Sequence, residues 1–542
     1  MLRKIRILLA GLFFILVNLL FFDVSGLLHR YLDWVAKIQF LPALLAFNVG
    51  AVIVIVALTF VFGRLYCSII CPLGILQDII SWMAGRRRKY RFSYAPPRRW
   101  LRNGVFAAFV IAFIAGAGGI ASLIAPYSAY GRVATHLFAP LYAWGNNFLA
   151  WIAESMNSYA IHSTEVWFKG GLPLLVALMT LATIAIMAWR SGRLWCNAIC
   201  PVGTALGVIS RWSLFKPRVD LNKCSHCGLC ARGCKSACID AHSGTVDASR
   251  CVTCFDCLKN CHLGALRYGL IQRKTSQEVS PTHVPESSRT IESPERMDAS
   301  DINIDSDLSP KTSKLPAESK TTANAEQMSS ESANPGRRAF LAAAGLMALE
   351  GAAQAQAVKV DGGLAPIEEK QLPPRQTPIS PPGSQGAANL AKHCTSCQLC
   401  VAACPNQVLR PSQSIKSCLR PELSFERGYC RPECVTCAAV CPTGAIQPIT
   451  AEEKASLQIG HAVWTKARCV VLRDGVNCDN CAAHCPVGAI HMGPLDAENP
   501  ESPQIPMIDT ERCIGCGACE HLCPARPISA IHVEGHERHR AN

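Results

Sequence analysis

The chain has 542 residues, 30 cysteines and a formal net charge of +14, and half of its residues are hydrophobic. This length exceeds what one domain usually needs, and the apolar residues are concentrated in the first 190 positions. Most cysteines follow residue 220 in a regular rhythm, whereas a secreted disulfide scaffold is small and irregularly spaced. These features exclude a single soluble domain and a disulfide scaffold, and they favour a membrane protein with cysteine-rich domains.

Four apolar segments are expected to cross a membrane as helices, namely residues 7–22, 41–62, 103–128 and 170–189. The last three carry no charge and are long enough for a span of about 20 residues. The first follows the basic sequence RKIR, as in a secretory signal, but no small-residue cleavage site precedes Asp23. A retained signal anchor is therefore expected rather than a cleaved leader, and residues 1–220 are predicted to form an α-helical transmembrane domain with four spans.

The charge distribution predicts the orientation of these helices. Residues 63–102 hold nine Lys or Arg and one Asp, whereas the loops at 29–40 and 129–169 are close to neutral. The positive-inside rule then places the N-terminus, residues 63–102 and the segment after Trp189 in the cytoplasm. Topology alone explains the basic run, so no nucleic-acid partner is predicted.

A further uncharged segment, residues 133–153, complicates this topology. Pro140, Gly145 and the pair Asn146–Asn147 favour an interfacial or re-entrant element over another span. A fifth span here would move everything after it to the other side of the membrane.

One cysteine phrase occurs twice: GRLYCSIICPLG at residues 63–74 and GRLWCNAICPVG at residues 192–203. In each, two cysteines four residues apart share one face of a helix, which the following proline ends or kinks. Two such helix ends brought together would present four thiols at one spot, those of Cys67, Cys71, Cys196 and Cys200. They are predicted to form a catalytic redox or soft-metal site, with buried, inert cysteines as the alternative.

Six cysteine runs after residue 220 follow, with variations, the spacing C-x2-C-x2-C-x3-C of bacterial ferredoxins. Three thiolates of a run wrap a short loop around three corners of a [4Fe–4S] cube, and the fourth reaches the partner cube. Zinc sites instead separate two cysteine pairs by a longer spacer. The runs predict six [4Fe–4S] clusters in α+β ferredoxin domains, two clusters in residues 221–271 and four in residues 388–535.

If three cysteines of each run bind one cluster and the fourth binds the partner cluster, 24 cysteines fall into six sets of four. We call this the pairing rule, and we name each set by its first member. The first domain has the sets Cys224, Cys227, Cys230 and Cys261, and Cys251, Cys254, Cys257 and Cys234. The C-terminal domain has the sets Cys394, Cys397, Cys400 and Cys441; Cys430, Cys434, Cys437 and Cys404; Cys469, Cys478, Cys481 and Cys523; and Cys513, Cys516, Cys519 and Cys485.

Some positions depart from the ferredoxin pattern. Lys235 and His262 stand where proline is usual, and Cys238 is an alternative to Cys234 as ligand. The first gap is stretched after Cys430 and Cys469, which weakens both assignments. Cys418 is left over as a bystander thiol.

The region between the two ferredoxin domains divides into three segments. Residues 272–335 hold 13 Ser and many acidic residues, so they are predicted to be a disordered linker. Residues 336–358 carry Arg337–Arg338, an Ala-rich stretch and AQAQA, the order of a twin-arginine export signal, with an amphipathic helix as the alternative. Residues 359–387 are predicted to be a second linker.

On these motifs the chain resembles a fusion of two families. The helices, the two C-x-x-x-C-P phrases and the dicluster runs of residues 1–271 resemble NapH-type membrane ferredoxins of periplasmic nitrate respiration, relatives of the membrane domain of the nitrous oxide reductase regulator. The leader, VCPTGAI and CIGCGACEHLCP in residues 336–535 resemble NapG-type four-cluster ferredoxins.

The resemblance implies a multi-pass protein of the bacterial inner membrane that acts as an electron-transfer component of a quinol dehydrogenase. Its donor would be the membrane quinone pool, and its acceptor a periplasmic reductase or cytochrome c. The first ferredoxin domain would stay cytoplasmic. The second would be exported, folded and cluster-loaded, through the twin-arginine translocon.

Two other functions remain open. Membrane ferredoxins associated with cbb3 oxidases resemble this chain in their C-x-x-x-C-P phrases, which implies a copper-reducing assembly factor. A redox-sensing regulator is the third hypothesis, but no DNA-binding or signalling segment supports it. Neither an S-G-A-T flavin-attachment sequence nor a C-x-x-C-H haem sequence is present. Quinol oxidation needs a proton acceptor, and the candidates on the predicted outer side are His29, Asp33, His136, Glu154, His162 and Glu165.

Overall fold

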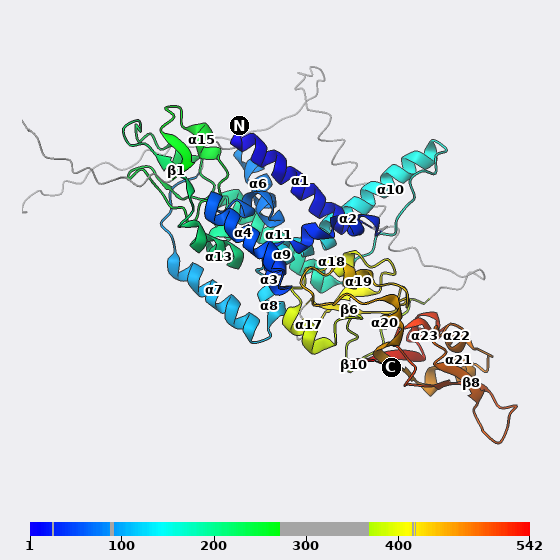
Figure 1. The fold of residues 1–542 in the computed structure, drawn as a ribbon. Coiled ribbons are helices and arrows are strands. Elements are labelled where there is room, and N and C mark those ends of the chain that lie inside the picture. The colour runs from blue at the N-terminus through cyan, green and yellow to red at the C-terminus, as the bar shows by residue number, and fades with distance from the viewer. Residues whose placement is uncertain (24–25, 87–91, 271–367, 415–416, 418, 542) are drawn as a thin grey trace, which may run out of the picture. The chain divides into compact units, whose positions relative to one another are not determined.

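A computed structural model describes residues 1–23, 26–86, 92–270, 368–414, 417 and 419–541 (Figure 1). The first 270 residues and the segment from residue 368 onward belong to one compact unit. The linker predicted at 272–335, the export signal predicted at 336–358 and Cys418 all lie outside the described residues.

The described residues up to 210 form helices joined by loops. Their elements are α1 (Leu2–Phe22), α2 (Leu27–Lys37), α3 (Phe40–Leu45), α4 (Val49–Phe62), α5 (Tyr66–Ile69), α6 (Pro72–Gly85), α7 (Arg99–Ile114), α8 (Gly118–Ser122), α9 (Pro126–Val133), η1 (Ala134–Phe138, a π-helix), α10 (Ala139–Ser155), α11 (Gly171–Ser191), α12 (Leu194–Ala198) and α13 (Pro201–Ser210).

Two helices of the described residues, α1 and α11, are long and apolar enough to cross a membrane. Each has 21 residues, which corresponds to about 31 Å. Large apolar side chains such as Leu8 and Ile15 on α1 and Leu175 and Met179 on α11 are exposed. Exposed apolar surface along a whole helix suits contact with lipid better than contact with water.

The other two expected spans form shorter helices than predicted. The segment 41–62 is divided by Asn48, whose side chain caps α4 by accepting a hydrogen bond from Ala51 N, so α4 has 14 residues. The segment 103–128 is divided after α7, which has 16 residues, and Gly116 follows with a φ of +76°. Helices of about 21 and 24 Å fall short of a hydrocarbon core of about 30 Å.

The segment 133–153 continues the helix begun by α9 without the break that a re-entrant element would need. The π-turn of η1 precedes Pro140, which lies in the first turn of α10. Most of α10 is exposed, including Tyr142, Trp144 and Trp151. Exposed Trp and Tyr are typical of a membrane interface, so the interfacial prediction stays open.

Short helices and two-stranded antiparallel ribbons make up both cysteine-rich domains. The first has β1 (Phe215–Val219) paired with β4 (Leu266–Leu270), β2 (Ile239–Asp240) paired with β3 (Thr245–Val246), α14 (Leu229–Arg232) and α15 (Asp256–Asn260). We call residues 215–270 the first block.

The second block, residues 368–541, repeats this architecture. Its helices are α17 (Ala387–His393), α18 (Leu399–Ala402), α19 (Thr436–Ala439), α20 (Ala451–Ser456), η2 (Lys466–Arg468), α21 (Val470–Arg473), α22 (Asn480–Ala483) and α23 (Ala518–Leu522). Its ribbons pair β5 (Leu409–Pro411) with β6 (Pro421–Leu423), β7 (Leu457–Trp464) with β10 (Ile531–Ala541), and β8 (Ile490–Pro494) with β9 (Gln504–Ile508).

The described part of the predicted second linker is packed against this block. Lys370 Nζ donates hydrogen bonds to the carbonyl oxygens of Glu520, His521 and Cys523 at the end of α23. Arg375 forms a buried ion pair with Glu520, and Ile379 is fully buried. Residues 368–387, which were expected to belong to a linker, therefore pack against the second block, where they satisfy helix-end carbonyls that the sequence pattern does not reveal.

The two blocks contact opposite ends of α1 and α11. At the first block, Arg3 near the start of α1 pairs with Asp256 at 2.6 Å, and Arg193 N just after α11 donates to Lys235 O. At the second block, Gly131 lies between Phe21, near the end of α1, and the Cys397 carbonyl. Lys169, just before α11, donates to Val401 O at 3.0 Å. Both membrane-length helices thus run from one block to the other.

The repeated phrases pack against each other through crossed arginines. Arg193 Nη1 donates to the carbonyl oxygen of Cys67 at 2.7 Å, and Arg64 Nη2 donates to that of Cys196 at 3.0 Å. Each arginine therefore belongs to one phrase and hydrogen-bonds the other. The packing is close: a Cβ atom on Gly74 would lie 2.3 Å from Cys67 O of the same phrase and 2.6 Å from Arg193 Nη1 of the other phrase. A Cβ atom on Gly203, the matching position, would lie 2.1 Å from Cys196 O of the same phrase and 2.8 Å from Arg64 Nη2 of the other.

A buried charge network holds the first block to the helices. Asp78 on α6 pairs with Arg6 at 2.6 Å, with Arg193 at 2.8 Å and with Lys235 at 3.5 Å. Lys235 also pairs with Asp256 at 2.9 Å. Burial alone would raise the pKa of Asp78, but the attraction of Arg193, Lys235 and Arg6 outweighs burial and holds that pKa well below its usual range. One carboxylate thus joins α1, α6, the second phrase and the first block.

Replacing Gly74 with Ala should destabilise the protein by about 1–3 kcal/mol, because the added methyl group overlaps a backbone carbonyl. The midpoint of thermal unfolding of the detergent-solubilised full chain, at a fixed scan rate, measures this change. Gly85→Ala on the same helix is the matched control, because nothing lies within 4 Å of a Cβ there. Equal midpoints for the two variants would contradict the close packing of Gly74 against Cys67 O and Arg193 Nη1.

Replacing Asp78 with Asn should cost about 3–5 kcal/mol, because three buried cations then lose their shared carboxylate. A depressed folded pKa adds stability above the unfolded value and loses it only as the pH falls through the folded value. The difference from wild type should therefore stay constant between about pH 5 and pH 8. Asp474→Asn, in an exposed pair with Arg473, is the control and should leave the unfolding midpoint unchanged.

Candidate functional site

The six cysteine runs have related local structures. In five of them the first two cysteines lie in one loop, whereas α21 separates Cys469 from Cys478, and in all six the third cysteine lies on a helix of a single turn. The cysteines on these helices are Cys230 (α14), Cys257 (α15), Cys400 (α18), Cys437 (α19), Cys481 (α22) and Cys519 (α23). Each short helix turns the third sulfur back toward the loop that precedes it.

Four of the loops also share an unusual backbone conformation. The residues on either side of the second cysteine have positive φ, as at Thr253 (+53°) and Phe255 (+61°). The other pairs are His226 and Gly228, Ser396 and Gln398, and Gly515 and Gly517. Such turns curl a loop so that its N–H groups face inward and form an anion-binding concavity. The two runs with stretched first gaps depart from this pattern: Val435 (−118°) and Asp479 (−126°) follow the second cysteine with negative φ.

The Cys224 set lines one cavity in the first block. Cys224, Cys227, Cys230 and Cys261 all form its wall, together with apolar residues such as Leu229 and Leu266. Cys227 is exposed, so this cavity lies close to the surface of the block. A wall with four cysteine side chains is chemically suited to a sulfur-liganded cluster.

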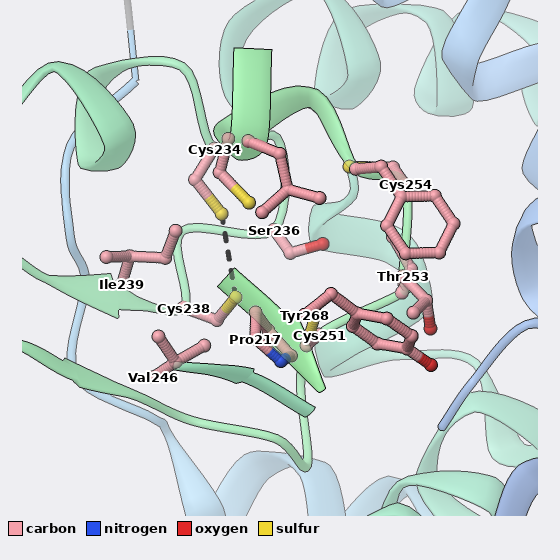
Figure 2. A pocket seen from close by; sticks show the side chains of 14 residues that line it. Pro217, Cys234, Ser236, Cys238, Ile239, Val246, Cys251, Thr253, Cys254 and Tyr268 are labelled. Carbon is pink, nitrogen blue, oxygen red and sulfur yellow. Dashed lines mark hydrogen bonds between the residues drawn. The ribbon is translucent and has the colours of Figure 1, made fainter. Parts of the chain in front are cut away.

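The Cys251 set lines a second cavity, in which five cysteines meet. Cys251, Cys254 and Cys257 form its wall with both Cys234 and Cys238 (Figure 2). Cys234 Sγ and Cys238 Sγ are 3.5 Å apart, and this hydrogen bond lowers the pKa of Cys234 to about 7. The structure therefore brings both alternatives for the fourth ligand to the same cavity.

The second block also gathers the predicted sets. Burial raises the pKa of Cys394 and of Cys397 to about 12, and the nearby Cys441 adds to both shifts. Burial raises the pKa of Cys481 to about 12, with Cys478 and Cys523 adding to it. In the same way, Cys404 and Cys430 raise the pKa of Cys437, and Cys485 raises the pKa of Cys513 and of Cys516, in each case in addition to the effect of burial. Cysteines far apart in the sequence thus lie close enough to interact electrostatically, and their assignment to cluster sets stays a prediction.

Neighbouring sets form a series within the second block. Cys430 N donates a hydrogen bond to Cys516 O at 2.9 Å, which joins the Cys430 and Cys513 sets. In the predicted sets, exchange of Cys404 and Cys441 would join the Cys394 and Cys430 sets, and exchange of Cys485 and Cys523 would join the other two. The predicted order is therefore Cys394, Cys430, Cys513 and Cys469, with the Cys394 set against α9.

The structure brings the thiols of Cys67, Cys71, Cys196 and Cys200 together between the two phrases. All four are buried, and Cys196 and Cys200 interact electrostatically with Cys67 and Cys71. Burial raises the pKa of Cys71 and of Cys200, and the neighbouring cysteines raise both further. Among the described residues, no group of three or more Cys, His, Asp or Glu side chains is placed to hold a metal ion.

Three polar side chains that the motif analysis did not single out surround these thiols. Gln77 Nε2 donates to Cys196 Sγ at 3.3 Å. Arg64 and Arg193 lie 3.9 Å from Cys67 Sγ and Cys196 Sγ respectively. Burial raises the pKa of Cys67, and the charge of Arg64 opposes that increase. Both phrases begin with Gly-Arg, and this repetition is the feature of the sequence that could have indicated a role for Arg64 and Arg193.

The outer-side candidates for proton transfer do not form a cluster. His29 is buried, and its Nδ1 lies 2.8 Å from the Asp23 carboxylate. His136 in η1 is also buried, and burial lowers its pKa to about 4. Asp33 pairs with Lys37 and Glu165 with Arg427, whereas Glu154 and His162 are exposed.

Models of known families match three segments of the chain. A model described as a 4Fe-4S binding domain matches residues 44–91 and again residues 172–220. Each of these segments contains one of the repeated phrases, which indicates a duplicated unit. A model of a 4Fe-4S dicluster domain matches residues 476–526 in the second block.

Curated relatives are ferredoxin-type proteins. The chain is 30% identical over 155 residues to the methylamine utilization ferredoxin-type protein MauM of Methylobacillus flagellatus, covering 28% of this chain and 65% of the relative. It is 27% identical over 229 residues to the ferredoxin-type protein NapH of Escherichia coli, covering 41% of this chain and 67% of NapH. It is 27% identical over 159 residues to the ferredoxin-type protein NapF of Escherichia coli, covering 29% of this chain and 87% of NapF.

The matches cover between half and two thirds of the most similar relatives, and no solved structure matches the chain. Together they show an iron–sulfur protein with 4Fe–4S domains that is similar to NapH-type ferredoxins.

Proposed function

We propose that the chain is a membrane-anchored electron-transfer protein that oxidises quinol and passes the electrons to a periplasmic acceptor. The observation that carries this proposal is the placement of two cysteine-rich blocks at opposite ends of α1 and α11. Within the part of the chain that the structure describes, those helices are the two that are long and apolar enough to cross a membrane. Blocks at opposite ends of membrane-crossing helices would face opposite compartments.

The six cysteine sets would hold six [4Fe–4S] clusters. Such clusters accept and release single electrons, at potentials set by burial and by hydrogen bonds to sulfur. Backbone N–H groups already donate to several of the sulfurs, as Ser396 N does to Cys394 Sγ at 3.4 Å. In the second block the series of sets leads away from α9, so the Cys394 set would lie nearest the membrane and the Cys469 set farthest from it.

The orientation follows from the charges. The first block contacts the basic segment 63–102, since Arg64 Nη1 donates to Ser249 O and Phe92 N donates to Arg232 O, and this segment favours the cytoplasm. The second block contacts α9 and Lys169, within the nearly neutral segment 129–169. We therefore infer that the second block is periplasmic, in agreement with the export signal predicted before it.

Oxidation of a quinol to a quinone releases two electrons and two protons, so a base is needed near the membrane surface. His29 is the stronger candidate, because the Asp23 carboxylate beside Nδ1 fixes the tautomer that leaves Nε2 as acceptor. His136 is a weaker base, since burial lowers its pKa to about 4. Both lie in segments predicted to be on the outer side.

The first prediction of this proposal concerns iron. Anaerobically purified wild-type protein should contain about 24 iron atoms, and Cys234→Ser should lose about four of them if Cys234 is a ligand. Cys238→Ser should then retain the wild-type content. The reverse result would assign Cys238 as the ligand, and a content of four irons or fewer in the wild type would refute the six-cluster proposal.

The second prediction concerns the electron donor. Quinol added to membranes containing the wild-type protein should bleach the iron–sulfur absorbance. His29→Gln should slow this reaction about a hundredfold without affecting reduction by dithionite, because only quinol oxidation needs the base. His162→Gln, at an exposed histidine, is the control. An unchanged rate in His29→Gln would remove His29 from the mechanism, and no bleaching in wild type would remove quinol as the donor.

The same membranes test the copper-handling alternative, for which the four buried thiols between the phrases are the candidate ligands, although in the described residues they are not placed around one metal position. Copper binding that disappears when Cys67, Cys71, Cys196 and Cys200 are all replaced by Ser would support that role. If the quadruple variant instead loses only quinol-dependent bleaching, the thiols belong to the electron path.

A further inference from the structure

A cavity of about 400 Å³ lies where α7, the end of α11, the second phrase and the first block meet. Residues 92–102 form one side of it, and Met187, Arg190 and Leu194 form the opposite side. Ser236, Ala237 and Arg250 of the first block close it. None of its wall residues belongs to a predicted cluster ligand set.

The wall of this cavity is strongly positive. It contains five arginines and no Asp, Glu or His. The five are Arg98, Arg99, Arg102, Arg190 and Arg250. We call it the arginine cavity. Elsewhere in the fold buried cations share a carboxylate, as Arg6 and Arg193 do with Asp78.

Two of these arginines are more than nine-tenths buried and have unused donors. Arg102 is 5% exposed, and no described atom accepts a hydrogen bond from its Nε. Arg250 is 6% exposed; its Nε pairs with Asp247 and its Nη1 donates to Ala95 O, but its Nη2 has no acceptor among the described residues. A buried donor on a charged group is costly to leave unsatisfied, so an anion inside the cavity would be stabilised.

We propose that the arginine cavity binds the phosphate group of an anionic ligand. The planar guanidinium fork of arginine matches the tetrahedral oxygens of phosphate and binds them in pairs. A single carboxylate can be bound by one or two arginines, so five arginines around one cavity favour phosphate over a carboxylate ligand. Other polar groups of the wall, including Asn197 and Ser236, add hydrogen-bonding capacity.

The apolar part of the wall indicates an anionic phospholipid as the source of the phosphate. Leu101, Met187, Leu194 and Ile199 line the cavity beside the arginines. It lies at the start of α7 and the end of α11, where Trp100 and Trp189 are exposed in the manner of membrane-interface anchors. The choice of a phospholipid as the ligand rests on the proposed membrane location, whereas the binding of phosphate does not depend on that location.

The test uses the full chain in detergent, titrated separately with phosphatidylglycerol, phosphatidylcholine and inorganic phosphate. Native mass spectrometry counts bound lipid, and the thermal unfolding midpoint follows phosphate. The test variants are Arg102→Gln and the double variant Arg99→Gln with Arg190→Gln, whose two positions are exposed. The matched control is Arg218→Gln with Arg267→Gln, a cross-strand pair of exposed arginines in the first block.

We expect wild-type protein to bind phosphatidylglycerol at least tenfold more tightly than phosphatidylcholine. Both test variants should lose about tenfold in affinity, and the control variant should lose nothing. Phosphate binding with the same dependence on the variants, but no preference for phosphatidylglycerol, would support the site and assign free phosphate as the ligand.

The proposal is overturned if wild type binds neither phosphatidylglycerol nor phosphate, or if the double variant binds as wild type does. Should Arg102→Gln fail to fold, as loss of iron would show, the exposed double variant still decides the question. Iron content and quinol-dependent bleaching, measured on the same samples, separate this result from the proposed function.

Discussion

The crossed hydrogen bonds between Arg64, Arg193 and the carbonyl oxygens of Cys196 and Cys67 are the interaction on which the rest of the structure depends. They hold the ends of two duplicated helical units in contact and leave room for glycine alone at positions 74 and 203. The same contact gathers four thiols in a buried space. Because each guanidinium belongs to one phrase and its acceptor to the other, neither unit completes the site by itself.

The buried arginines on the two sides of this contact differ in whether a carboxylate compensates their charge. On one side, Asp78 is shared by Arg6, Arg193 and Lys235, so the first block and α1 are attached through a compensated buried network. On the other side, the arginine cavity has five cations and no acidic residue in its wall. A buried cation needs a counter-charge or water. The Asp78 network supplies that counter-charge from within the fold and stabilises it, whereas the arginine cavity is the region where we propose that a bound anion supplies it.

The cysteine runs show how a short motif controls local geometry. In four runs the residues around the second cysteine take positive φ, and in all six a single helical turn carries the third cysteine. In the other two runs the gap after the first cysteine is longer, and the residue after the second cysteine has a negative φ. The regular spacing therefore accompanies a specific loop shape, in which backbone N–H groups face the sulfurs that a cluster would bridge.

The sequence by itself determined the cysteine-rich 4Fe–4S domains and the duplicated phrase, because ligand spacing is a local property. The pairing of cysteines such as Cys394 with Cys441 stays a prediction from the sequence. The sequence also identified α1 and α11 as apolar helices, since hydropathy is read directly from composition. Only the tertiary structure decided that α4 and α7 are short, that residues 368–387 pack onto the second block, and that Cys234 and Cys238 share one cavity. It alone revealed the crossed arginines, Asp78 and the arginine cavity. The crossed arginines, the Arg193–Asp78 pair and the Arg102–Ser249 contact each join residues more than a hundred positions apart, and no periodicity or spacing within a single segment encodes such contacts.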